Sequence, residues 1–401
     1  MADEDRGAGA RPTEATPRAT LAEVALLFLR LGFTAFGGPA AHVAIMETEI
    51  VRRRRWLSSE RFLDLLGAAN ILPGPSSTEL ALFIGYEQAG WRGLLVGGAC
   101  FILPAAIMVA LLASAYVRFG TIPQVAGLLY GIRPVVIAVV GQALWSLAPK
   151  ATKKSFRLAV LGVLAAVASA LGVEALWVLV GGGVASILAS QAATQKDVAR
   201  SLHPSVLGVL AAAGASVAAP VSLIALFLTF LKIGAVVFGS GYVLLAFLRA
   251  DLVDRLHWLT EPQLLDAVAI GQVTPGPVFT TATFIGYVVG ARGGPWTAVG
   301  GAVLATVGIF LPGFLLVAVT RPLVARLRRS PVAGAFLDGV NVAALALMAV
   351  VTVQLAKTAL VDVPTILIAL VGVVALIRFK LNTTWLVVGG AALGVATHGL
   401  R

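Results

Sequence analysis

The sequence contains little charge. Only 12% of its 401 residues are charged, whereas soluble globular domains average roughly 25%. Hydrophobic residues make up 59% of the chain. This composition excludes a soluble enzyme and an intrinsically disordered protein. At roughly 20 apolar residues per membrane helix, the chain can supply about ten to twelve spans, with little left for an aqueous domain.

Cysteine is nearly absent as well. The single cysteine, Cys100, lies in an apolar run, which excludes a disulfide framework and a cysteine metal cluster. No Walker A pattern is present, so this chain is not expected to use ATP. We expect no metal, no cofactor and no catalytic residue. Residues 1–20 contain no apolar stretch and are predicted to be a disordered tail, not a signal peptide.

Basic residues exceed acidic ones, 30 to 19, which gives a net charge of +11. In a soluble protein this excess would indicate nucleic-acid binding. Here the basic residues occur in short bursts between apolar runs, a pattern typical of the cytoplasmic loops of membrane proteins. We therefore expect the lipid bilayer as a partner and no nucleic acid.

The chain contains an internal duplication. Residues 28–82 and 230–284 align at an offset of 202, with sixteen of 55 positions identical. The triplet Pro73-Gly74-Pro75 returns as Pro275-Gly276-Pro277. Many transporters are built from such repeats. The predicted division is a first repeat (21–190), a connecting segment (191–220) and a second repeat (221–401).

Each repeat is predicted to hold the same elements in the same order. These are an interrupted first helix, a segment broken at the Pro-Gly-Pro triplet, and four further spans. The predicted bounds are 21–46, 60–86, 93–117, 122–147, 156–171 and 175–190 in the first repeat, and 221–248, 261–288, 296–320, 332–356, 364–377 and 384–398 in the second.

The basic bursts predict orientation. When every burst is placed in the cytoplasm, the two repeats face opposite ways. The segment 60–86 then begins and ends on one side, and its arms of about 10–15 residues fall short of the ~17 that a span needs. This favours a re-entrant hairpin, with two short proline-kinked spans as the alternative. The predicted fold class is an all-α integral membrane protein with two inverted-topology repeats, about ten full transmembrane helices and two broken, re-entrant Pro-Gly-Pro hairpins.

The Pro-Gly-Pro breaks are candidate anion sites. A broken helix leaves backbone N–H and C=O groups unpaired, which is tolerated only where protein or a water-filled cavity satisfies them. Proline is favoured in the first helical turn, and the N-terminus of the helix that follows attracts anions. Alternatively, the triplet only kinks the chain and the hydroxyls bond helix carbonyls. The candidate binding residues are Pro73, Gly74, Pro75, Ser76, Ser77, Thr78, Pro275, Gly276, Pro277, Thr280 and Thr281.

Ionisable residues also occur inside apolar segments. Arg30 and Lys232 occupy equivalent positions in the two repeats. A cation within a span is costly, so each is expected to face a cavity or a partner. Together they suit an anion with more than one charge. Alternatively, each reaches the membrane interface or pairs with a carboxylate such as Asp64 or Asp266.

Four further polar residues are candidates for a coupling or partner role. Arg133 aligns roughly with Asn341, and both lie within the fourth span of their repeat. Glu79 follows the first Pro-Gly-Pro by one turn and is either a proton site or a partner for Arg30. His42 could titrate near neutral pH, although a structural histidine is the commoner reading.

Several motifs together resemble the chromate ion transporter family, in its long two-domain form. They are Phe36-Gly37-Gly38-Pro39 with Glu47, Leu72-Pro73-Gly74-Pro75, Phe238-Gly239-Ser240-Gly241-Tyr242 and Gln272-Val273-Thr274-Pro275-Gly276-Pro277. The resemblance covers residues 21–400. The resemblance supplies no residue roles, and we add the glycine-rich breaks at Gly37, Gly38, Gly239 and Ser240 to the candidate binding residues on our own inference from matching positions.

The resemblance implies chromate efflux across the bacterial plasma membrane, with chromate resistance as the result. It also implies a relation to sulfate, which has the same charge and nearly the same shape. A transporter of sulfate or another anion, an anion channel and a membrane-bound reductase remain alternatives, and a homodimer is left open.

Overall fold

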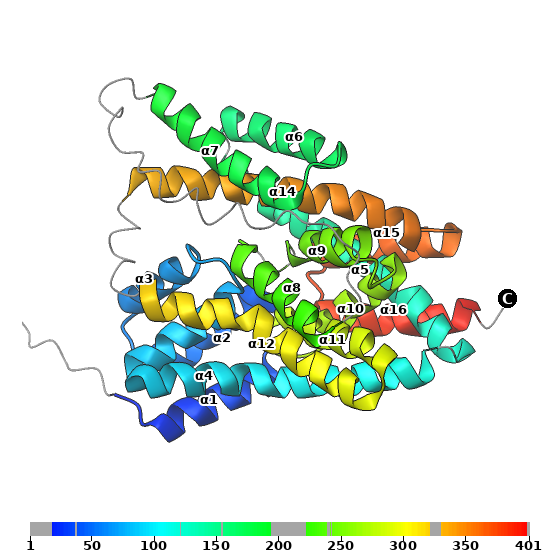
Figure 1. Cartoon of the computed structure of the whole chain (residues 1–401), viewed down its shortest axis with the longest axis horizontal. Helices are drawn as coiled ribbons and strands as arrows, with labels where there is room; N and C mark the ends of the chain where they lie inside the picture. The colour runs from blue at the N-terminus through cyan, green and yellow to red at the C-terminus, as the bar shows by residue number, and fades with distance from the viewer. Residues whose placement is uncertain are drawn as a thin grey trace, which may run out of the picture.

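The computed structural model describes residues 18–36, 38–120, 122–153, 155–193, 222–238, 241, 243–320 and 330–398. Within these ranges all regular secondary structure is helical and no strand occurs. The all-α fold class is therefore confirmed for the described chain. The long helices run roughly along the longest axis of the molecule (Figure 1).

The two halves contain equivalent helices in the same order. In the first half these are α1 (Leu21–Thr34), α2 (Gly38–Glu47), the π-helix η1 (Thr48–Arg53), α3 (Ser59–Ala69), α4 (Ser76–Phe119), α5 (Pro123–Thr152), α6 (Phe156–Ala170) and α7 (Ala175–Ala193). In the second half they are α8 (Leu223–Val236), α9 (Leu244–Leu248), the π-helix η3 (Arg249–Arg255), α10 (Glu261–Val273), the 3₁₀ turn η4 (Val278–Thr280), α11 (Thr281–Gly290), η5 (Ala291–Gly293), α12 (Pro295–Thr320), α14 (Pro331–Ala359), α15 (Val363–Arg378) and α16 (Thr383–His398).

Hydroxyl residues begin equivalent helices in both halves. Thr20 and Ser222 cap α1 and α8, and Ser58 and Thr260 cap α3 and α10. Each side chain accepts a hydrogen bond from the backbone N–H three residues later, which satisfies a group that the helix leaves unpaired. The duplication thus preserves the helix start signals along with the helices.

The first segment of the first half returns to the end where it began. Gln88 accepts from the Ala19 N–H at 3.0 Å and donates to the Trp56 carbonyl at 3.2 Å. The chain before α1 and the chain after η1 therefore meet. We expected a single interrupted span over 21–46, counted among about ten crossings; instead α1 and α2 form two arms of a hairpin. The cause is the break at residues 35–37, after which α2 turns back.

The Pro-Gly-Pro segment forms a second returning pair of arms. Arg61 at the start of α3 contacts Glu87 at 2.7 Å, so the two ends of the predicted 60–86 segment lie together. In the second half, Arg292 donates to the Trp258 carbonyl at 2.6 Å. The broken helix is confirmed, and its first arms, 11 and 13 residues long in α3 and α10, are too short to span ~30 Å of hydrocarbon.

Helix α4 contains a second reversal. Ala89 and Gly90 have non-helical backbone angles, and Gly90 has φ +62°. The chain turns there, and Gly85 packs so closely on Gly93 that a Cβ on either would overlap the other backbone. The second half does the same at Gly294, between η5 and α12.

The equivalent helices α5 and α14 run antiparallel. Lys153, at the end of α5, contacts Asp338, near the start of α14, at 2.7 Å. At the other end, Tyr130, near the start of α5, donates to Asp362, just beyond α14, at 2.6 Å. Helices related by the duplication thus point in opposite directions.

The last two helices of each half pack on the other half. Helices α6 and α7 lie along α14, and α15 and α16 pack on α5; the first group is seen together in Figure 1. Glycines allow the approach: Gly131 of α5 meets Gly390 and Gly394 of α16, and Gly182 of α7 meets Gly339 of α14. Small residues of this kind let membrane helices pack backbone to backbone.

By length and composition, four described segments can cross a membrane: 125–152, 295–320, 331–359 and 76–119, the last of which is divided by the reversal at Ala89-Gly90. Five shorter apolar helices accompany them, at 156–170, 175–191, 223–236, 363–378 and 383–397. A multi-pass membrane protein is therefore supported, whereas the full number of crossings stays a prediction.

The glycine contact between α5 and α16 predicts a specific sensitivity. Gly131→Ala places a methyl group against the Gly390 carbonyl, and we expect it to lower the free energy of unfolding by about 1–3 kcal/mol. Gly141→Ala, on the same helix, meets nothing within 4 Å and serves as the matched control. Thermal unfolding of the purified protein in detergent measures both. Equal stability of the two variants would contradict the packing.

Candidate functional site

Each Pro-Gly-Pro turn makes an equivalent hydrogen bond to the end of the broken first helix of the other half. The Gly74 N–H donates to the Val237 carbonyl at 2.7 Å, and the Gly276 N–H donates to the Ala35 carbonyl at 2.9 Å. Val237 and Ala35 are the residues that end α8 and α1. Gly74 and Gly276 have φ values of +129° and +90°, which other residues adopt only with strain. Each turn therefore satisfies the broken helix of the other half.

The glycine-rich breaks lie beside these turns where the structure describes them. Gly38 begins α2 with φ +77°. Gly241 lies close to Pro39 and to Val278, 3.8 Å from each when measured from its Cβ position. Gly37, Gly239 and Ser240 are outside the described residues. A binding role for these breaks stays a prediction.

His42 connects two of these elements. Its Nε2 lies 3.0 Å from the Ala35 carbonyl oxygen, and its Nδ1 lies 3.4 Å from Ser77 Oγ. The ring is buried and packs edge-on against Phe101. With both ring nitrogens bonded, His42 holds the end of α1 against the start of α4, as expected of a structural histidine.

The start of α4 carries unpartnered polar atoms. Thr78 Oγ1 and both carboxyl oxygens of Glu79 are buried and have no hydrogen-bond partner among the described residues. Glu79 is 0% exposed. Its carboxyl reaches back over the N-terminus of α4 and lies against Gly74, where a Cβ would overlap it. A partnership of Glu79 with Arg30, one of the two sequence readings, is therefore not formed.

The second turn differs from the first. Thr280 donates to the Pro277 carbonyl at 2.8 Å, and Thr281 donates to the Val278 carbonyl at 2.8 Å. Their hydroxyls are thus used within the chain, which is the alternative that the sequence left open. The turn is followed by three 3₁₀ residues before α11 begins, so Pro277 does not open an α-helix directly.

Asp266 is the centre of a buried ion pair. Arg133 of α5 donates to both carboxylate oxygens, at 2.8 and 2.9 Å, and Tyr116 of α4 donates to one at 3.0 Å. Asp266 is fully buried, and Arg133 is 28% exposed. This bidentate geometry is the strong form of the arginine–carboxylate pair. It joins α10 to helices of the first half, and Asn341 takes no part in it.

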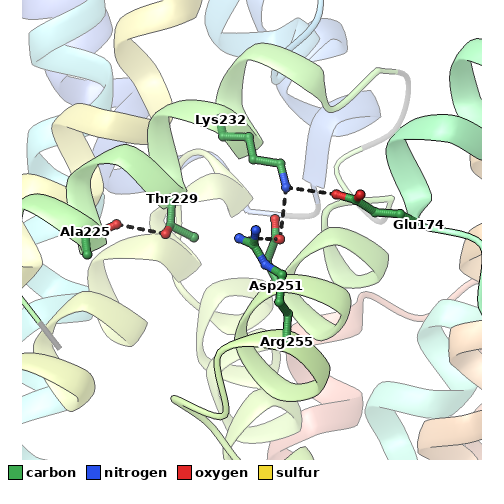
Figure 2. A network of polar contacts seen from close by, with 6 residues as sticks. All are labelled: Glu174, Ala225, Thr229, Lys232, Asp251 and Arg255. Atoms are coloured by element: carbon green, nitrogen blue, oxygen red, sulfur yellow. Dashed lines mark hydrogen bonds and ion pairs between the residues drawn. The ribbon is translucent and has the colours of Figure 1, made fainter. Parts of the chain in front are cut away.

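Lys232 lies in a second charged network (Figure 2). Its ammonium contacts Asp251 of η3 at 3.1 Å and Glu174, in the turn before α7, at 3.4 Å. Arg255 contacts the same Asp251 oxygen at 2.9 Å. The sequence alternative of pairing with a carboxylate is thus realised, with Asp251 and Glu174 in place of Asp64 and Asp266. A cavity of about 460 Å³ borders the network.

Arg30 does not share the environment of its repeat partner. It is exposed on the face of α1 that also carries Leu26 and Phe33. Glu49, the counterpart of Asp251, pairs with Arg53 at 2.7 Å. In this conformation the structure does not bring Arg30 and Lys232 together at the Pro-Gly-Pro turns. Asp64 is half-buried on α3.

The sequence reading did not identify Tyr116, Glu174 or Asp251 as contact residues. Asp251 could have been found, because it aligns with Glu49 at the same offset of 202 and each has an arginine four residues later. Tyr116 and Glu174 carry no such signal, since their partners lie 150 and 58 residues away. No group of three or more histidine, cysteine or acidic side chains that could hold a metal occurs within the described ranges.

A bundle of apolar helices whose two related halves carry broken helices is typical of multi-pass membrane transporters. The sequence profile described as "Chromate transporter" matches residues 22–187 and again 224–395. The chain belongs to the chromate transporter family, and each half corresponds to one copy of the family unit.

Relatives cover almost the whole chain. A chromate transport protein of Cupriavidus metallidurans is 33% identical, over 96% of this chain and 95% of the relative. A probable chromate transport protein of Synechococcus elongatus is 32% identical, over 94% and 96%. A chromate transport protein of Pseudomonas aeruginosa is 30% identical, over 92% and 90%. No solved structure matches the chain.

The buried ion pair gives a stability prediction. Asp266→Asn leaves Arg133 without its carboxylate, and since Arg133 is partly exposed we expect a loss of about 2 kcal/mol, below the ~3–5 of a fully buried pair. The double variant Arg133→Gln/Asp266→Asn should lose less than the sum of the two single variants. Denaturation in detergent measures all three. Asp338→Asn, which breaks the more exposed contact with Lys153, is the control, and an additive double variant would contradict the coupling.

Proposed function

We propose that the chain is an oxyanion transporter that exports chromate across the bacterial plasma membrane and thereby confers chromate resistance. The observation that carries the proposal is the meeting of two broken helices in the interior, with a helix N-terminus and unpartnered polar side chains at the first turn. A helix N-terminus and hydroxyls are suitable donors for a tetrahedral dianion. The chromate transport proteins among the relatives supply the substrate class.

The membrane potential is a sufficient driving force for export. Moving one charge through 100 mV is worth about 2.3 kcal/mol, so a dianion leaving an inside-negative cell gains roughly 4.6 kcal/mol. Uptake of the same ion would require coupling to another gradient. In this proposal Arg30 attracts the dianion through its charge, whereas Asp251 and Glu174 compensate the charge of Lys232 in the conformation described. Neither cation is a ligand in this conformation.

We propose an inverted membrane topology for the two repeats. The antiparallel course of α5 and α14 supports it, as do the basic bursts when they are assigned to the cytoplasm. Alternating access then follows from exchanging the conformations of the two halves. The unequal environments of Arg30 and Lys232 agree with a structure in one of the two end states of alternating access.

The topology predicts which residues are accessible from outside the cell. In a Cys100→Ala background, Leu171→Cys and Val361→Cys should react with a membrane-impermeant maleimide in whole cells. Phe379→Cys should react only after permeabilisation. All three side chains are exposed. Leu171 and Phe379 lie in the equivalent turns of the two repeats, between α6 and α7 and between α15 and α16, so labelling of Leu171→Cys and Phe379→Cys from the same side would contradict the inverted arrangement.

Transport itself is tested in vesicles. Purified protein in liposomes with an inside-negative potential should release preloaded chromate, and release should accelerate with the potential. Empty liposomes and liposomes with heat-denatured protein are the controls. Sulfate in place of chromate distinguishes a general dianion carrier, because equal release of both would make sulfate an equal substrate. No movement of either ion would refute the proposed function.

A further inference from the structure

Glu79 is the most unusual side chain in the described chain, because it is a fully buried carboxyl with no partner. It lies one turn into α4, and its side chain reaches back toward the helix N-terminus, as helical side chains do. The carboxyl rests on the backbone of Gly74 in the first Pro-Gly-Pro turn and close to Gly313 of α12. Thr78, next to it, has a buried hydroxyl that is also unpartnered.

The Glu79 carboxyl and the Thr78 hydroxyl can both act as hydrogen-bond donors. A carboxylate buried without donors is far more costly than the neutral acid, and the neutral acid has an O–H to donate. The Thr78 hydroxyl and the N–H groups of Ser76 and Ser77 add further donors, whereas the N–H groups of Thr78 and Glu79 already donate to the Pro75 carbonyl. A Cβ at Gly74 would overlap the carboxyl, whereas a Cβ at Gly313 would be in ordinary van der Waals contact with it. A tetrahedral oxyanion at this turn would accept from all of these groups.

The second half lacks this arrangement. At the offset of 202 the counterpart of Glu79 is Thr281, whose hydroxyl is already bonded to the Val278 carbonyl. The carboxyl is therefore not required by the fold of the repeat, since the equivalent turn forms without it. Among the described residues 73–79 and 275–281, Glu79 is the single carboxylic acid.

A carboxylic acid donor can distinguish oxyanions that shape cannot. Chromate, selenate and sulfate are all tetrahedral dianions, and small differences in size discriminate weakly. They differ in basicity, because hydrogen chromate is a weak acid whereas hydrogen selenate and hydrogen sulfate are much stronger acids. A hydrogen bond from an acidic O–H to a more basic oxygen is stronger, as in other charge-assisted pairs.

We propose that Glu79 is the specificity-determining residue of this transporter and that its neutral carboxyl donates to the bound oxyanion, selecting the more basic chromate over sulfate. The inference rests on the proposed function, because it assumes that an oxyanion occupies the first Pro-Gly-Pro turn. It predicts selection by basicity, whereas a rigid pocket would select by size.

Selenate separates the two explanations, because it is close to chromate in size and close to sulfate in basicity. Purified protein in liposomes is allowed to take up labelled chromate while unlabelled selenate, sulfate or chromate competes. We expect selenate and sulfate to compete equally poorly, each about tenfold less effectively than chromate. If selenate competes as well as chromate, selection is by size and the proposal is overturned.

The variant Glu79→Gln tests the residue directly. Its amide keeps the shape and the neutral charge, but an N–H donor responds less to acceptor basicity, so chromate uptake should persist while the preference over selenate falls to about twofold. Glu87→Gln, on the same helix at the contact with Arg61, is the control and should keep the full preference. An unchanged preference in Glu79→Gln overturns the proposal.

The outcomes also separate this inference from the proposed function. If the wild-type protein moves none of the three oxyanions, the function itself fails. If it moves chromate but does not discriminate by basicity, only the role of Glu79 fails. Should Glu79→Gln not fold, the selenate comparison on the wild-type protein still decides, and Glu79→Asp, which keeps the acid, should retain the preference.

Discussion

The crossed hydrogen bonds between the two halves are the constraint on which the rest of the structure depends. A helix that stops inside hydrocarbon exposes carbonyls that nothing in the lipid can satisfy. Here the carbonyls of Ala35 and Val237 are each met by a glycine N–H of the opposite half. The break in the first helix of each half therefore depends on a backbone donor from the other half. The same interruptions that form the candidate site also join the two repeats.

The same reciprocity extends to the outer helices. Because α5 and α14 run antiparallel and each carries the last two helices of the other repeat, the boundary in the sequence is not a boundary in the packing. The buried Arg133–Asp266 pair also joins the first repeat to the second. The molecule is one intertwined bundle, although its sequence reads as two consecutive copies, and any motion of one copy must act through contacts with the other.

Sequence patterns predicted the helices well because hydropathy, proline and glycine are local signals. The break at Pro73–Pro75 and its copy, and the order of the spans, were all visible in this way. What failed was long-range: that α1 and α2 return to one end rests on Gln88, about seventy residues beyond Ala19. The contact of each Pro-Gly-Pro turn with the end of α1 or α8 in the other half is also long-range, and the binding role of the turns stays a prediction. The partners of Lys232 come from other elements, one of them from the first repeat, and no spacing rule identifies such contacts.

The exchange of helices has a consequence for how the protein is made. Helix α7 ends at Ala193, but α14, against which α6 and α7 pack, begins only at Pro331. At about 5–20 residues per second, roughly 7 to 28 seconds of synthesis separate them. During that interval two short apolar helices wait in the membrane without their native neighbour. During biosynthesis the packing of the first half is therefore incomplete until α14 of the second half has been synthesised.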